Sequence, residues 1–99
     1  MLLAHAVTLA EARSHIAALA DHARTVEASS AFERALIELD WAHGDDVPAL
    51  DTFGITDDRD ILMAVAVSAV QQLFDYGLDA LQMELLLAAL ADARALDEP

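Results

Sequence analysis

Two histidine patterns contain the residues of this chain best placed for chemistry. Asp40-x-x-His43 has the spacing at which one helix can present two ligands to one metal ion, and Glu11 and His15 share a helical face. Di-metal helical bundles need such a pair on two helices, with further acids facing inward. No second E-x-x-H or D-x-x-H occurs in the chain. We therefore expect no metal site and no cofactor, and keep a small metal-assisted helical enzyme using Asp40 and His43 as an alternative.

Nucleophilic catalysis has no supporting pattern. Cysteine is absent, which removes disulfides, thiolate ligands and cysteine nucleophiles together. No serine sits in the glycine-flanked turn that exposes a catalytic hydroxyl, and no glycine-rich loop could cradle a phosphate. The sequence predicts no catalytic residue, so we expect that the protein is not an enzyme.

The most acidic stretch is residues 45–60, which hold six aspartates against one arginine. Asp45, Asp46 and Asp51 could bind a basic partner. The aspartates at positions 57, 58 and 60 instead fall in the first turn of an expected helix, where the helix dipole stabilises carboxylates. Their spacing does not match an EF-hand loop. Asp45, Asp46 and Asp51 are thus candidate partner-binding residues, with plain solvation as the alternative.

The overall charge limits the class of partner. Eighteen acids stand against five bases, giving a formal charge of −13, which repels nucleic acid and anionic membranes. We expect a protein partner, basic if it is charged, and no direct binding of nucleic acid or membrane. An acidic mimic of DNA that inhibits a nuclease or DNA-binding protein is an alternative. No basic, apolar leader or membrane span is evident, so a cytoplasmic location is expected.

Apolar periodicity predicts four helices in a single domain covering 1–99. Twenty-two alanines favour helix throughout. The expected helices cover about 8–28, 30–43, 57–76 and 79–96. T-x-x-E and S-x-x-E capping boxes predict that the first two begin at Thr8 and Ser30. The third should be capped by Thr56 or Asp57, and the fourth by Asp79.

Two glycines and one long connection predict the topology. Gly44 and Gly77 are typical left-handed stops at the ends of the second and third helices. The Gly77 connection is so short that the third and fourth helices must form an antiparallel hairpin, and the first and second form another. A crossover of about a dozen residues joins them. We predict a compact all-α four-helix bundle with the very apolar third helix at its centre.

The surplus of apolar helical surface is the most informative feature for function. Ile37 and Trp41 project among charged residues of the second helix, and Leu81 and Leu85 lie opposite the core face of the fourth. A closed bundle needs about one apolar stripe per helix. We therefore predict that these four residues form a protein–protein interface, most simply that of a twofold homodimer. In the alternative, the crossover folds over them within one chain.

Two short motifs resemble those of known families but lack a defining feature. The run from Gly77 to Leu81 is similar to the G-x-D-S-L motif of acyl carrier proteins, with Ala80 in place of the serine that carries the pantetheine arm. Trp41 to Gly44 is similar to the W-x-G turn of small helical-hairpin secretion substrates, but its spacing is W-x-x-G. Neither resemblance assigns a family.

Overall fold

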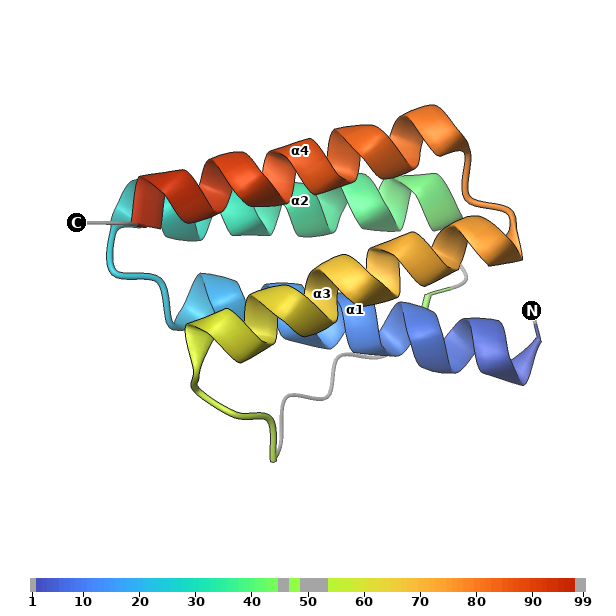
Figure 1. The fold of residues 1–99 in the computed structure, drawn as a ribbon, viewed down its shortest axis with the longest axis horizontal. Coiled ribbons are helices and arrows are strands. Elements are labelled where there is room, and N and C mark those ends of the chain that lie inside the picture. The colour runs from blue at the N-terminus through green and yellow to red at the C-terminus, as the bar shows by residue number, and fades with distance from the viewer. Residues whose placement is uncertain (1, 45–46, 49–53, 98–99) are drawn as a thin grey trace.

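The fold is a bundle of four α-helices (Figure 1), described by a computed structural model for residues 2–44, 47–48 and 54–97. The helices are α1 (Leu3–Asp21), α2 (Val26–His43), α3 (Arg59–Leu73) and α4 (Ala80–Asp97), and α3 continues into a short 3-10 turn, η1 (Phe74–Tyr76). No strand occurs in the described ranges. The prediction of an all-α four-helix bundle is confirmed.

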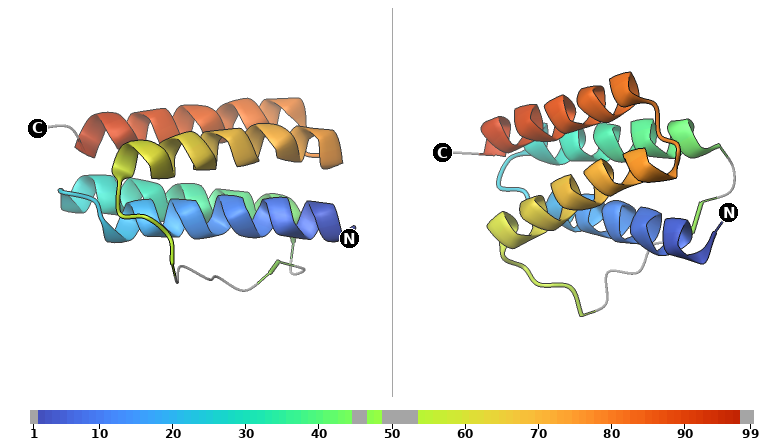
Figure 2. Two further views of the ribbon diagram at one scale, coloured as in Figure 1. Left: turned by 60° about the horizontal axis from the view of Figure 1, so that its bottom comes forward. Right: turned by 45° about the vertical axis from the view of Figure 1, so that its right-hand side comes forward.

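The chain forms two antiparallel hairpins, α1–α2 and α3–α4. Helices α2 and α3 run in the same direction. α1 and α2 run antiparallel, as do α3 and α4, and the crossover returns the chain to the end of the bundle where α2 began (Figures 1 and 2). Packing across the hairpins is closest between α1 and α3 and between α2 and α4. The bundle is therefore held together between the hairpins as well as within them.

The start of the first helix differs from the prediction. α1 begins at Leu3, so Thr8 lies inside the helix and its T-x-x-E box caps nothing. Leu2 occupies the cap position without a side-chain hydrogen bond. Because Leu, Ala and His at positions 3–6 do not break a helix and His5 stacks on a ring from η1, one further turn forms ahead of the expected cap.

The junction between α1 and α2 also differs. α1 ends at Asp21 rather than Ala28, and Thr25 caps α2 by accepting a hydrogen bond from the Ala28 amide at 3.0 Å. The predicted cap, Ser30, lies within the first turns of α2. Thr25 is therefore the working cap, and the turn before it forms earlier than expected.

The later helix ends agree better with the sequence. Asp58, one residue beyond the predicted caps, accepts hydrogen bonds from the amides of Asp60 and Ile61 and starts α3. Asp79 accepts from the amides of Leu81 and Gln82, as predicted. Gly77 adopts a left-handed φ of 106° directly after η1, which confirms it as the stop that only a residue without Cβ adopts easily.

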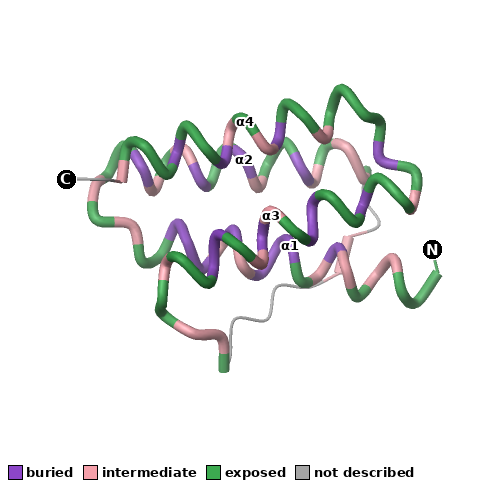
Figure 3. The backbone as a smooth tube through the Cα atoms, viewed as in Figure 1, coloured by how far each residue is buried: buried purple, intermediate pink, exposed green. Residues whose placement is uncertain are grey.

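One apolar core fills the space between the helices. It is built from leucines, one phenylalanine and a few other large apolar residues packed against alanines, and Figure 3 shows its buried positions on all four helices. Its largest fully buried members are Phe32, Leu9, Ile16, Leu39, Leu62, Leu73, Leu90 and Val70. α3 buries one face, but it packs mainly on α1 and leaves Ile61 exposed, so the prediction that it lies at the centre of the bundle is wrong. Phe74, expected in the core, is about half exposed because it falls in the tighter η1 turn.

Polar contacts close the end of the bundle where α1 passes into α2. The largely buried Asp97 carboxylate accepts a hydrogen bond from the Arg24 amide and pairs with Arg59 at 3.6 Å. The Thr25 hydroxyl donates to the Leu96 carbonyl, and Arg94 pairs with Asp60. The last turn of α4 thereby fixes the α1–α2 turn and the start of α3.

Candidate functional site

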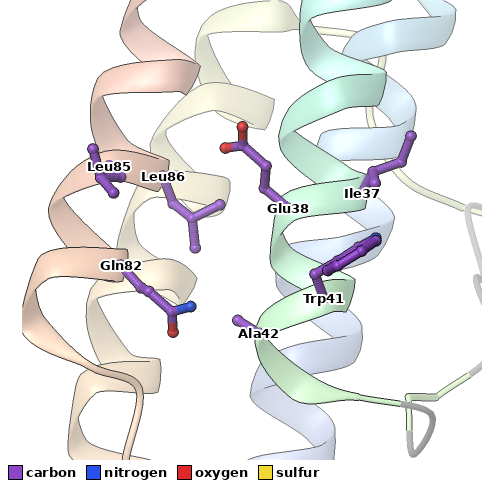
Figure 4. Close-up of a pocket in the computed structure, with 7 residues that line it drawn as sticks. All are labelled: Ile37, Glu38, Trp41, Ala42, Gln82, Leu85 and Leu86. Carbon is purple, nitrogen blue, oxygen red and sulfur yellow. The ribbon is translucent and has the colours of Figure 1, made fainter.

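An apolar groove lies between α2 and α4. Its volume is about 290 Å³, and the lining residues are Ile37, Glu38, Trp41, Ala42, Gln82, Leu85 and Leu86. Figure 4 shows Leu86 pointing from α4 toward α2, with Glu38 and Gln82 extending across the gap from opposite helices. The described lining is mostly apolar, and Glu38 is the one charged residue in it.

The four apolar residues predicted for an interface are all exposed. Trp41 has 83% of its surface accessible, and Ile37, one turn earlier, 56%. Leu81 and Leu85 on α4 are 63% and 57% exposed. Ile37, Trp41 and Leu85 line the groove, and Leu81 lies one turn from Leu85 on the same face of α4.

The exposed apolar residues continue along both helices. Val26 precedes Ile37 by eleven residues, and Leu96 follows Leu85 by the same interval, which is close to three helical turns. Each pair therefore shares a helix face, and both added residues are exposed. We name the set Val26, Ile37, Trp41, Leu81, Leu85 and Leu96 the α2/α4 face.

The described parts of the crossover lie away from Trp41, which is exposed (Figure 2). Arg13 on α1 donates a hydrogen bond to the carbonyl of Pro48, which holds that part of the crossover on α1. Figure 2 shows the described parts of the crossover on the side of the bundle opposite α4. Because Trp41 itself is 83% exposed, the alternative in which the indole is enclosed within one chain is contradicted. Asp45, Asp46 and Asp51 lie outside the described residues.

The residues of the metal alternative are engaged in other contacts. The Asp40 carboxylate receives two hydrogen bonds from Arg13, at 2.7 Å from Nε and 3.2 Å from Nη2. The His43 Nδ1 donates to the Leu39 carbonyl at 2.9 Å, and the His15 Nδ1 donates likewise to the Glu11 carbonyl. Among the described residues, no three His, Asp or Glu side chains group as metal ligands. The Asp40-x-x-His43 spacing is present on α2, but the Asp40 carboxylate is bound by Arg13.

Removing the Asp40 carboxylate should destabilise the fold. Arg13 is only 10% exposed at its side chain, so Asp40→Ala leaves a buried guanidinium without its carboxylate. We expect urea unfolding to give a loss of about 1.5–3 kcal/mol. The control is Asp60→Ala, which breaks the exposed pair with Arg94 and should cost at most about 1 kcal/mol. Equal losses in the two variants would contradict a structural role for the Arg13–Asp40 pair.

A cluster of His5, His43 and Tyr76, which was not predicted from the sequence, lies beside one end of the groove. The ring of His5 stacks on Tyr76 with centroids 5.2 Å apart, and meets His43 edge-on at 5.5 Å. Within the described part of the chain, the buried His5 Nε2 has no hydrogen-bond partner. A second hollow of about 320 Å³ is lined by these three residues and shares Ala42 and Gln82 with the groove. Burial, and then the nearby His43, lower the pKa of His5.

The lowered pKa of His5 predicts the direction in which the unfolding free energy changes with pH. The unfolded chain takes up a proton on His5 near pH 6.5, whereas the folded chain does so only at lower pH. The contribution of neutral His5 is therefore complete above pH 6.5 and is lost as the pH falls through the folded pKa. We expect the fall in unfolding free energy between pH 7.5 and 5 to be smaller in His5→Phe, which keeps a ring against Tyr76. An identical pH response in the two proteins would contradict this assignment.

Comparisons with known proteins do not add a relative. No family model matches the chain, and no curated protein or solved structure matches it significantly. No helix in the described ranges is long and apolar enough to span a membrane. The class that the structure defines is thus a four-helix bundle with an exposed apolar groove.

Proposed function

We propose that this protein is a non-enzymatic protein–protein interaction module, such as an adaptor, antitoxin, immunity or regulatory protein, that binds its partner through the α2/α4 face. The exposure of Trp41 carries the proposal. This large indole stays 83% accessible while the core beneath it is closed. Tryptophan is enriched among the residues that dominate binding energy at interfaces, and apolar patches with polar surroundings mark binding surfaces.

The partner can be a different protein or a second copy of the chain. The homodimer predicted from the surplus apolar surface would use the same face, and it stays a prediction. A cytoplasmic setting is part of the proposal, since the chain has no cysteine and so gains nothing from an oxidising compartment.

Site-specific photo-cross-linking in the source cells tests the proposal. Trp41→benzoylphenylalanine places a photoreactive group in the groove, and Ile61→benzoylphenylalanine places it on α3, where the native residue is 50% exposed. We expect irradiation to give a discrete protein adduct from position 41 and none of the same mass from position 61. An adduct of twice the 10.6-kDa chain would identify a second copy as the partner.

Comparison of position 41 with the control position 61 decides whether the α2/α4 face is a binding surface. If position 41 yields no adduct, or the same adducts as position 61, the α2/α4 face is not a binding surface and the proposal fails. The exposed apolar residues would then be ordinary surface leucines and a solvated tryptophan.

A further inference from the structure

The charge that the fold leaves uncompensated is almost entirely negative. Ion pairs engage three of the five arginines, Arg13, Arg59 and Arg94, each with one aspartate. Of the fourteen described aspartates and glutamates, eleven form no ion pair, whereas only Arg24 and Arg34 stay unpaired among the arginines. The exposed surface therefore attracts cations and repels a body of like charge.

One of these uncompensated carboxylates lies in the groove itself. Glu38 extends from α2 toward α4, into the gap that Leu86 enters from α4 (Figure 4). Among the described residues, no other charged side chain lines the groove. A cationic group seated there would meet Glu38 beside a low-dielectric apolar floor, where a charge-assisted hydrogen bond is stronger than in open water.

The shape of the face matches a helix. α2 and α4 are each eighteen residues long, so each extends about 27 Å. Their exposed apolar residues recur at intervals of four and eleven, and the hollow between them is small and open. A groove of this kind accepts apolar side chains from one face of an amphipathic helix laid along it.

A second copy fits the same face less well. It would bring its own charge of −13 against this one, with no unpaired basic cluster among its described residues to offset the repulsion. The same negative charges that oppose self-association attract a cationic partner.

On these grounds, and resting on the function proposed above, we propose that the occupant of the α2/α4 face is a cationic amphipathic helix of another protein. Its apolar residues lie between Trp41 and Leu85, and a lysine or arginine lies against the Glu38 carboxylate.

Trp41 is the only tryptophan, so its fluorescence reports the groove alone. The full chain is titrated with an eighteen-residue Leu/Lys amphipathic helical peptide, and separately with a Leu/Glu peptide of the same pattern. We expect a saturable blue shift of Trp41 emission with the Leu/Lys peptide, weakened by salt, and no shift with the Leu/Glu peptide. Glu38→Gln should weaken Leu/Lys binding about fivefold, the size of one ion pair.

A cationic peptide is attracted to every face of this protein, so Glu11→Gln serves as the matched control. It removes the same charge from an exposed glutamate on α1, and should change affinity much less than Glu38→Gln. Equal effects of the two variants, or equal binding of both peptides, overturn the cationic-helix proposal but leave cross-linking at position 41 intact. A Trp41 shift that appears on raising the protein concentration without peptide assigns the face to a second copy, which also overturns it.

Discussion

Leu73→Ala should lower the free energy of unfolding by about 2–5 kcal/mol, the range for truncating a leucine in a closed core. Leu73 is fully buried in the last turn of α3, directly before the chain tightens into η1. The deletion therefore removes apolar contacts and leaves a cavity that the adjoining turn restricts from collapsing. Urea unfolding followed by circular dichroism measures the change.

Leu85→Ala is the matched control, because it is the same substitution on a neighbouring helix at a residue that is 57% exposed. It should change stability by no more than about 0.5 kcal/mol, as surface substitutions do. A small effect at Leu73 together with a large one at Leu85 would mean that the core and the exposed face have been assigned to the wrong sides of the bundle.

Trp41→Ala should separate binding from stability. Because the indole is mostly exposed in the single chain, its loss should alter the unfolding free energy by about 0.5 kcal/mol or less. Binding of the partner identified by cross-linking should weaken about 30-fold or more, as expected for a central aromatic hot spot worth about 2 kcal/mol. Calorimetric titration of that partner into each variant measures the effect.

Ile61→Ala supplies the comparison for Trp41→Ala. Ile61 is also an exposed apolar residue, but it lies on α3 outside the groove, so its truncation should leave partner binding unchanged. Retained binding by Trp41→Ala, with a steep loss of stability, would show that the indole belongs to the core.

The sequence predicted the number of helices, the later helix ends and the apolar residues Ile37, Trp41, Leu81 and Leu85 that lie outside the core. Gly77 and Asp79 act through their own backbone or through amides two or three residues away, so local chemistry suffices to place them. Trp41 and Leu85 could be assigned to the surface because apolar periodicity on α2 and α4 already had a complete core stripe without them.

The α1–α2 junction could not be predicted, because two capping signals compete within a few residues. Thr25 and Ser30 can each cap a helix, and only contacts distant in sequence select Thr25. The Ser29 hydroxyl donates to the Ala20 carbonyl, and the Asp97 carboxylate at the far end of the chain accepts from the Arg24 amide. Neither contact can be recognised from the spacing of residue types near the junction.

The same reason explains the missed polar contacts of the site. The sequence does not reveal the partner of Asp40, because Arg13 lies on another helix at a register that only packing defines. His5 lies near neither Tyr76 nor His43 in the sequence, yet all three meet where the N-terminal turn of α1 reaches η1 and the end of α2.

Acrylamide quenching of Trp41 in the isolated chain, at a concentration where sedimentation gives a single 10.6-kDa species, tests most directly whether the fold leaves this face uncovered. Acrylamide is neutral, so the charge of −13 does not repel it. We predict quenching close to that of free tryptophan amide and equally red emission. Blue emission with strong protection in the single chain would contradict the account, because the indole would then be enclosed by its own fold.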